Sequence, residues 1–223
     1  MSDRPVITLR DFVVEYPSFQ LGPIDLEVRP GEEVALFGLN GAGKSTLLRA
    51  LSGRLPQFSG HAEICGHSLQ KHRSSIRSLV GYADPDVPGY AWMSVEQYLE
   101  FIGALHPHWD ASYALDLRTL FQLPGETPIA NLSKGMRSRL SLIGALAHNP
   151  QLLMLDEPVT GLDPLARTQM LHFIDSAREH TSGLTLLFAT HQAVDLHEIG
   201  QRILLMHNGE VIRETSFGEA LLG

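Results

Sequence analysis

The chain has 223 residues, of which 43% are hydrophobic and 19% charged, a balance that suits one compact globular domain with a sizeable core. Its 25 acidic residues outnumber its 17 basic ones and give a net charge of −8, which argues against nonspecific binding to nucleic acid or to an anionic membrane surface. No apolar stretch approaches the roughly 20 residues of a membrane-spanning helix and the N-terminal sequence lacks an apolar signal region, so we expect a soluble, cytosolic protein that reaches a membrane only through a partner.

Short apolar runs predict the strands of the fold. Turn residues such as Pro23, Pro30 and Gly31 separate the first runs, which indicates an antiparallel β layer. Later runs alternate with helical patterns, as is typical of parallel βα units. Cys65, the only cysteine, fits a buried apolar position. The predicted strands cover residues 6–14, 24–28, 34–37, 62–65, 152–155, 185–189 and 203–206.

A glycine-rich loop, GLNGAGKST at residues 38–46, lies between the predicted strand 34–37 and a helical run at 46–51. Glycines let the backbone wrap closely and point its N–H groups at phosphate oxygens, and the helix N-terminus adds positive potential. In this pattern Lys44 reaches the β- and γ-phosphates and the Ser45 hydroxyl ligates Mg²⁺. The alternative is a merely flexible glycine loop. The residues expected to bind ATP here are Gly38, Asn40, Gly41, Ala42, Gly43, Lys44, Ser45 and Thr46.

The segment from about 86 to 149 is helix-rich. Ser94 and Gln97 form a capping-box pattern before an apolar run at helical spacing. Asp110 is a candidate N-cap for a second helix, and a third is predicted over 133–148. We expect these helices to form a lobe inserted in an α/β core.

Two acidic residues end the apolar run LLMLDEP at 152–158. Ligands of open α/β sheets lie at the carboxyl ends of the strands, where these acids emerge. We expect Asp156 to hold Mg²⁺ through a water molecule and Glu157 to polarise the water that attacks the γ-phosphate. The alternative, two solvent-facing turn acids, is disfavoured by the phosphate loop upstream.

With LSKGM at 132–136, GLDP at 161–164 and ATH at 189–191, these motifs resemble an ABC-type ATPase domain in order and spacing across essentially the whole chain. The resemblance implies an α/β fold, a P-loop NTPase (RecA-like) core with an antiparallel β subdomain and an inserted α-helical subdomain. It implies one domain over 1–223, with about 1–85 and 150–223 as core and about 86–149 as the helical subdomain. ATP and Mg²⁺ are the implied cofactors, and ATP hydrolysis is the implied activity.

The resemblance also implies that the site is shared between two subunits. In such domains Ser133 and Gly135 cap the γ-phosphate of ATP held by the opposing subunit. Lys134 replaces the first glycine of the family signature LSGGQ and either approaches the opposing nucleotide or projects into solvent; LSKGM resembles the signature of bacterial ABC-2-type exporter subunits. Asp163 matches an aspartate that crosses the dimer interface, and it is also a good N-cap.

Two further residues match family positions around the nucleotide. His191 matches the switch histidine that contacts the γ-phosphate and orients the attacking water, although a lone histidine is usually just a polar residue. Tyr16 matches the aromatic residue that stacks on adenine. Phe19 is the alternative, and Tyr16 would then be a packing residue at a strand end.

The chain departs from the family at VGYADPD, residues 80–86, where a glutamine usually touches the metal and the γ-phosphate. An ungapped comparison places Pro85 there. We expect Asp86, slightly favoured over Asp84, to contact Mg²⁺ instead, the alternative being an ordinary proline-rich turn. The nearby residues Tyr90, Trp92 and Met93 suit either a docking groove for a membrane-subunit helix or the core of the helical lobe.

The resemblance implies an ATPase that energises a membrane transporter from the cytoplasmic face of the cell (inner) membrane, and the expected direction of transport is export. Its expected partners are a separate transmembrane permease and a second ATPase subunit, identical or different, in a head-to-tail dimer; no nucleic acid is expected. A soluble ABC ATPase acting on nucleic acid or ribosomes is disfavoured by the single acidic domain. A binding-only regulatory subunit is disfavoured because Lys44, Asp156, Glu157 and His191 are all present.

Overall fold

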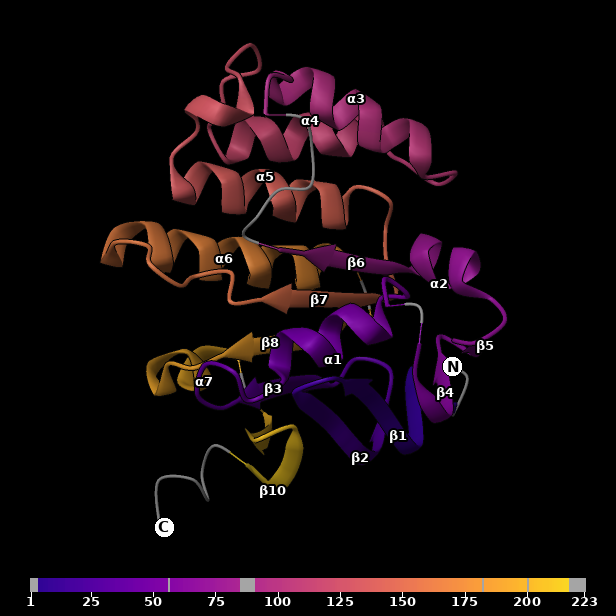
Figure 1. Ribbon diagram of the computed structural model, residues 1–223. Helices are drawn as coiled ribbons and strands as arrows, with labels where there is room; N and C mark the ends of the chain where they lie inside the picture. The colour runs from indigo at the N-terminus through magenta and orange to yellow at the C-terminus, as the bar shows by residue number, and fades with distance from the viewer. Residues whose placement is uncertain (1–3, 56, 85–90, 182, 200, 217–223) are drawn as a thin grey trace.

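The computed structural model describes residues 4–55, 57–84, 91–181, 183–199 and 201–216. Two β-sheets and a helical lobe make up the fold (Figure 1). The first sheet is antiparallel, in the order β2-β1-β4-β5, which confirms the predicted antiparallel layer. Its strands are β1 (Ile7–Tyr16), β2 (Phe19–Val28), β4 (Ser59–Ile64) and β5 (His67–Ser68).

The second sheet has six strands in the order β10-β9-β3-β8-β7-β6, and every neighbouring pair is parallel except β9 with β10. Strands β7 and β8 are buried along their whole length because other elements cover both of their faces. Strand β6, a four-residue edge strand with two small residues, is not among the strands predicted above. The strands are β3 (Glu33–Phe37), β6 (Val80–Ala83), β7 (Leu152–Asp156), β8 (Thr185–Thr190), β9 (Arg202–His207) and β10 (Glu210–Ser216).

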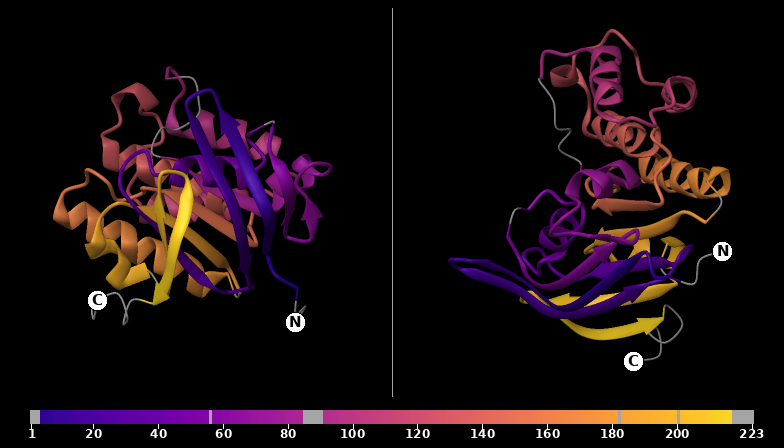
Figure 2. Two further views of the ribbon diagram at one scale, coloured as in Figure 1. Left: turned by 60° about the horizontal axis from the view of Figure 1, so that its bottom comes forward. Right: turned by 90° about the vertical axis from the view of Figure 1, so that its right-hand side faces the viewer.

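Four helices belong to the core: α1 (Lys44–Leu51), α2 (Arg73–Leu79), α6 (Pro164–His180) and α7 (Ala193–Ile199). The helical lobe contains α3 (Val95–Leu105), α4 (Ala111–Leu120), the 3₁₀ turn η1 (Ile129–Asn131) and α5 (Lys134–Leu146). Helices α3 and α4 lie at the opposite end of the molecule from the antiparallel sheet (Figures 1 and 2). The predicted Ser94–Gln97 capping box and the Asp110 cap are confirmed, and α5 ends two residues before the predicted His148.

The helical lobe packs directly on the parallel sheet through α5. A Cβ atom on Gly81 of β6 would lie 2.1 Å from the carbonyl oxygen of Ala145, so only glycine allows α5 to approach this strand so closely. A continuous apolar cluster joins the lobe to β7, β8 and α6. Met93 belongs to this cluster, whereas Trp92 is 67% exposed and Tyr90 lies outside the described residues. The docking interpretation is therefore wrong for Met93, which is a core residue.

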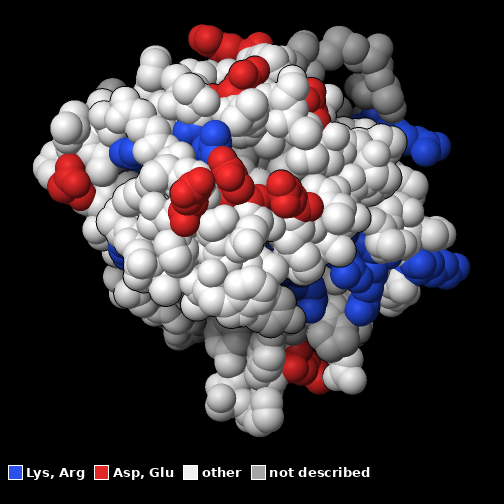
Figure 3. All heavy atoms as spheres, turned by 90° about the horizontal axis from the view of Figure 1, so that it is seen from above, with Lys and Arg blue, Asp and Glu red and all other residues white. Residues whose placement is uncertain are grey.

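The surface matches the acidic composition. Viewed from the end formed by the helical lobe, acidic side chains gather at the centre of the face, and basic ones lie mainly towards its edges (Figure 3). Within the part of the chain that the structure describes, no helix has the length and apolar character needed to cross a membrane. Cys65 is partly buried against the core, and burial raises the pKa of its thiol to about 12.

Candidate functional site

The loop after β3 leads into helix α1 through Gly43, whose φ of 105° is left-handed. No side chain caps this helix, so the N–H groups of its first turn point outward without a side-chain acceptor. Lys44 is almost fully buried, and its Nζ donates to the carbonyl oxygens of Gly38 at 2.8 Å and Leu39 at 3.1 Å. A Cβ atom on Gly38 would lie 2.3 Å from the Met206 carbonyl oxygen, so β9 requires glycine there. The loop is thus a rigid cradle with a fixed ammonium group inside it.

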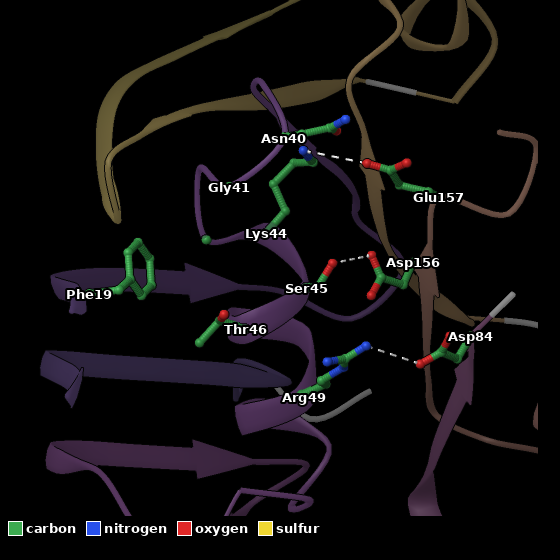
Figure 4. A pocket seen from close by; sticks show the side chains of 11 residues that line it. Phe19, Asn40, Gly41, Lys44, Ser45, Thr46, Arg49, Asp84, Asp156 and Glu157 are labelled. Carbon is green, nitrogen blue, oxygen red and sulfur yellow. Dashed lines mark hydrogen bonds and ion pairs between the residues drawn. The ribbon is translucent and has the colours of Figure 1, made fainter. Parts of the chain in front are cut away.

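This cradle forms one wall of a cavity of about 680 Å³ (Figure 4). Six of the eight predicted loop residues line it; Gly38 and Ala42 do not, because Gly38 packs on β9 and Ala42 is buried. Phe19 also lines the cavity, whereas Tyr16 lies beside it, with ring centroids 6.5 Å apart, and is 43% exposed. The structure therefore places the alternative aromatic residue, Phe19, against the cavity, and the stacking role of Tyr16 stays a prediction.

The two predicted carboxylates emerge from β7 on the opposite wall. The Ser45 Oγ donates to Asp156 Oδ1 at 2.8 Å, and the Lys44 Nζ lies 3.6 Å from Glu157 Oε1. Glu157 has a left-handed φ of 49°, which turns its side chain away from the strand direction. His191, directly after β8, has its Nδ1 3.1 Å from Glu157 Oε1, although the angle is not that of a hydrogen bond. The structure therefore brings Lys44, Ser45, Asp156, Glu157 and His191 together.

Tyr82, at the end of β6, joins this group, and sequence reasoning assigned it no role. Its hydroxyl lies 3.2 Å from Asp156 Oδ2 and 3.4 Å from Asp84 Oδ2, and Asp84 Oδ2 lies 3.5 Å from an Arg49 nitrogen. Burial raises the pKa of Tyr82, so the phenol keeps the single proton that it donates. Burial also raises the pKa of Asp156, while the donors Ser45 and Tyr82 oppose the shift. If a strand had been predicted over 80–83, Tyr82 would have been expected near the carboxyl ends of the parallel strands, where Asp156 lies.

The oxygen atoms of Ser45 and Asp156 fit Mg²⁺, a hard cation that proteins hold with one or two carboxylates together with substrate phosphates. Among the described residues no group of three or more His, Cys, Asp or Glu side chains could hold a metal ion alone. The predicted ligand Asp86 lies outside the described residues. Asp84, the alternative, lines the cavity and bonds through its N–H to Ser141 Oγ on α5 at 3.0 Å, so it ties the helical lobe to this site.

The LSKGM segment lies elsewhere on the surface. Ser133 is exposed and its Oγ accepts from the Met136 N–H at 3.2 Å, which caps α5. Lys134 is exposed and turns toward Gly161, where an added Cβ atom would lie 2.6 Å from its Nζ. Asp163 caps α6 by accepting from two N–H groups at 3.0 Å, which confirms the predicted cap. None of the residues of this segment lines the 680 Å³ cavity.

A buried network fixes the turn that carries His191. Asp195 is fully buried and accepts two hydrogen bonds from Arg167 on α6, at 3.0 and 2.7 Å, and one from the Thr190 hydroxyl. The Gln192 N–H in turn donates to Thr190 Oγ1 at 3.0 Å. Helix α6 begins directly after Asp163, so this network connects the Asp163 turn with the His191 turn. Sequence reasoning missed both Arg167 and Asp195, which lie 28 residues apart in the chain.

Known proteins share both the sequence and the fold. The family described as "ABC transporter" matches residues 21–160. The uncharacterized ABC transporter ATP-binding protein YxlF of Bacillus subtilis is 34% identical over 194 residues, covering 84% of this chain and 63% of the relative. The daunorubicin resistance ATP-binding protein DrrA3 of Streptomyces coeruleorubidus is 34% identical over 206 residues, covering 89% and 64%.

The solved structures agree with these relatives. One described as "Structure of ATP binding subunit of ABC transporter" superposes with a TM-score of 0.83 at 27% identity, covering 96% of this chain and 91% of that one. The likeness confirms the predicted P-loop NTPase fold. This chain spans less than two thirds of the length of the two curated relatives.

Proposed function

Because this chain belongs to the ABC transporter ATP-binding family, we propose that it binds and hydrolyses ATP and so energises a membrane transporter. The geometry that supports this is the convergence, on one cavity, of a phosphate cradle, a magnesium-type donor pair and a carboxylate placed for water activation. The cavity volume of about 680 Å³ falls within the usual range for sites that bind small molecules.

The proposed function gives each residue around the cavity a role in ATP binding or hydrolysis. The ammonium group of Lys44 and the N–H groups of α1 bind the β- and γ-phosphates and stabilise charge as it develops on them. Glu157 accepts a proton from the attacking water, and His191 orients the γ-phosphate and that water. Ser45 and Asp156 would hold Mg²⁺, which supplies charge neutralisation between the phosphates when bound. Lys44 now contacts Glu157, and the phosphates of ATP would separate the two groups.

One observation carries the proposal that a second subunit completes the site: the LSKGM residues do not line the cavity of their own subunit. Gly135 also supports the proposal that a second subunit completes the site. A Cβ atom there would meet only Leu162 Cδ2, at an ordinary 3.5 Å, so the fold of the subunit itself does not require glycine at this position. A close approach from outside does require it. Ser133, exposed at the N-terminus of α5, suits the phosphates of ATP held by the partner.

The membrane partner is proposed to be a separate permease at the cytoplasmic face of the membrane, and transport to be export. DrrA3 is named for daunorubicin resistance, and LSKGM resembles the signatures of ABC-2-type exporters. Trp92, exposed near the helical lobe, suits the permease contact. The acidic face of the lobe and the net charge of −8 give no support to a nucleic-acid partner.

The Glu157→Gln variant tests this proposal. Without the carboxylate that activates water, ATP should persist and hold two subunits together. Light scattering after gel filtration should then give twice the 24.6 kDa subunit mass with MgATP, and the subunit mass alone with MgADP. A variant that binds ATP and stays monomeric would reject the shared site.

A further inference from the structure

A second, smaller cavity lies between α2, α3, α5 and β6, and its volume is about 110 Å³. We call it the basic pocket, because four of the residues that line it have basic side chains: Arg54, Arg77, His106 and His148. No carboxylate is among the described residues that line it, although the protein has a net charge of −8. Two guanidinium groups without a carboxylate concentrate positive potential in a small volume.

The two arginines of the basic pocket have N–H groups available for an anion. The Arg54 guanidinium lies over the Tyr82 ring, 4.4 Å from its centroid, and Arg77 is in the last turn of α2. Neither arginine forms an ion pair with any part of the chain that the structure describes. By contrast Arg10, which is also exposed, is paired with Glu27. A guanidinium carries five donors in a fixed fork, which matches the oxygen atoms of phosphates and carboxylates.

His148 gives a second, independent indication of a ligand. It is only 2% exposed and stacks on His106 with ring centroids 4.2 Å apart, yet neither of its ring nitrogens makes a hydrogen bond of normal geometry among the described residues. The carbonyl groups of Val80 and Gly144 lie near the ring without meeting that geometry. A buried polar group without a hydrogen bond is unfavourable. An oxygen atom of a ligand in the pocket would supply the missing partner for a ring N–H.

Two hydroxyl groups add neutral donors to the basic pocket. The Ser141 Oγ accepts from the Asp84 N–H at 3.0 Å, so its own proton can be donated into the pocket. Tyr98 also lines the pocket, and burial raises the pKa of its hydroxyl to about 12, so this group keeps its proton. Together with the two arginines, donors come from the loop after α1 and from α2, α3 and α5. A tetrahedral oxyanion accepts from several directions at once, whereas a carboxylate presents two oxygen atoms on one side.

We propose that the basic pocket binds a free tetrahedral oxyanion, with inorganic phosphate as the ligand. The volume of the pocket equals only a few water molecules, at roughly 30 Å³ each, which suits a phosphate ion and excludes a nucleotide. Charge complementarity selects an anion, and Arg54 and Arg77 supply the forks that would bind it. A phosphate group at the end of a larger molecule, such as a lipid head group, shares this chemistry, and the test below distinguishes the two.

Tyr82 places this oxyanion site one side chain away from the nucleotide cavity. The ring of Tyr82 contacts Arg54 in the basic pocket, and the hydroxyl of the same residue lies 3.2 Å from Asp156 Oδ2 in the nucleotide cavity. A bound phosphate would compete with the ring for the Arg54 guanidinium. The nucleotide cavity could thus respond to phosphate, the product of ATP hydrolysis. This consequence rests on the proposed function, whereas the oxyanion site itself does not.

The test titrates the full chain with sodium phosphate and follows the ring C–H resonances of His106 and His148 by NMR, at constant pH and ionic strength. The chain carries Lys44→Ala, because phosphate also fits the cradle of the nucleotide cavity. Phosphate should shift both resonances to saturation, and sodium chloride should not. Arg54→Gln should weaken the binding at least about tenfold, the effect of losing one hydrogen bond from a charged donor.

Arg77→Gln, at an exposed position of α2, gives a second variant with the same expected loss. Arg213→Gln, which removes an exposed arginine on β10, is the matched control and should leave the binding unchanged. Glycerol 3-phosphate serves as the probe for a phosphate group on a larger molecule, and it should bind more weakly than inorganic phosphate because the small volume of the pocket disfavours the glycerol group.

Three outcomes would overturn the proposal: no saturable shift with phosphate, a response that survives both arginine substitutions, or binding of glycerol 3-phosphate that is as tight as that of phosphate. The last result would assign the basic pocket to the phosphate group of a larger molecule. ATP-dependent dimerisation of Glu157→Gln, measured in parallel, tests the proposed function separately. A normal dimer without a phosphate response rejects only the oxyanion site. The absence of a dimer rejects the proposed function and leaves a measured phosphate response in place.

Discussion

The nucleotide cavity and the basic pocket share Tyr82 but treat charge in opposite ways. In the nucleotide cavity each charged group already has a partner: Lys44 lies near Glu157, and Arg49 near Asp84. In the basic pocket Arg54 and Arg77 make no ion pair with any described residue. The nucleotide cavity is therefore pre-organised for a ligand that displaces internal ion pairs. The basic pocket has no such internal ion pairs among the described residues, so its arginines can bind a negative charge from another molecule.

The largest effect is expected from Lys44→Ala, which removes the only ammonium group among the described residues that line the nucleotide cavity. Both phosphate binding and charge stabilisation are lost, so ATP turnover should fall by about 1,000-fold or more. Steady-state phosphate release measures this. Lys71→Ala, at an exposed lysine, is the matched control and should keep full activity. Normal turnover in Lys44→Ala would show that this cavity is not the site of ATP hydrolysis.

Glu157→Gln should lower turnover by about 100- to 1,000-fold while ATP still binds, because the amide cannot accept a proton from water. Equilibrium binding of a fluorescent ATP analogue, together with single-turnover hydrolysis, separates the two properties. A loss of binding as large as the loss of turnover would mean that the internal Lys44–Glu157 pair is structural and not displaced by the phosphates.

Tyr82→Phe removes the hydroxyl at the boundary of the two pockets. Turnover should fall by less than about tenfold, the effect of one hydrogen bond. Burial already raises the pKa of Asp156, and the Tyr82 donor opposes that shift, so its loss raises this pKa further. Since Asp156 must be ionised to hold the metal, the acid limb of the pH–rate profile should move to higher pH. Tyr113→Phe serves as the control, and a limb that stays in place would contradict the contact.

The last prediction concerns the stability of the fold and not the turnover of ATP. Burial lowers the pKa of His148 to about 4, from the 6.5 of an exposed histidine, with the neighbouring His106 and His108 adding to the shift. Between pH 4 and pH 6.5 the unfolded chain binds more protons than the folded chain. The free energy of unfolding therefore falls by about 3 kcal/mol as the pH drops from 6.5 to 4. In His148→Phe this dependence should shrink, as urea unfolding at pH 7 and pH 5 would show. An equally steep dependence would refute the assignment, and His207→Gln should not alter it.

The parts that could be predicted from sequence are those that local chemistry determines. Residues 38–46 contain the whole phosphate cradle, and Ser94, Asp110 and Asp163 cap helices through bonds that span two or three residues. The motif is contained in nine consecutive residues between a strand and a helix, so it can be recognised without knowledge of distant contacts. The pattern therefore transfers directly from sequence to structure.

The rest depends on contacts between distant segments. Strand β6 is too short to give a pattern of its own, and it exists because it pairs with β7 and because Gly81 admits α5. Tyr82 and the basic pocket follow from that placement, as does the Arg167–Asp195 pair. The aromatic residue at the cavity could not be chosen either, since Tyr16 and Phe19 are neighbours across one turn and only the fold orients them.

The most direct test of the central claim, a site shared by two subunits, is to mix two inactive variants. Lys44→Ala keeps its LSKGM segment, and Gly135→Glu keeps its phosphate cradle and adds a Cβ atom that its own subunit accommodates at an ordinary contact distance. In an equal mixture half of the dimers are mixed, and each has one intact composite site, so activity should return to roughly a quarter of wild type. A mixture as inactive as its two components would contradict the account.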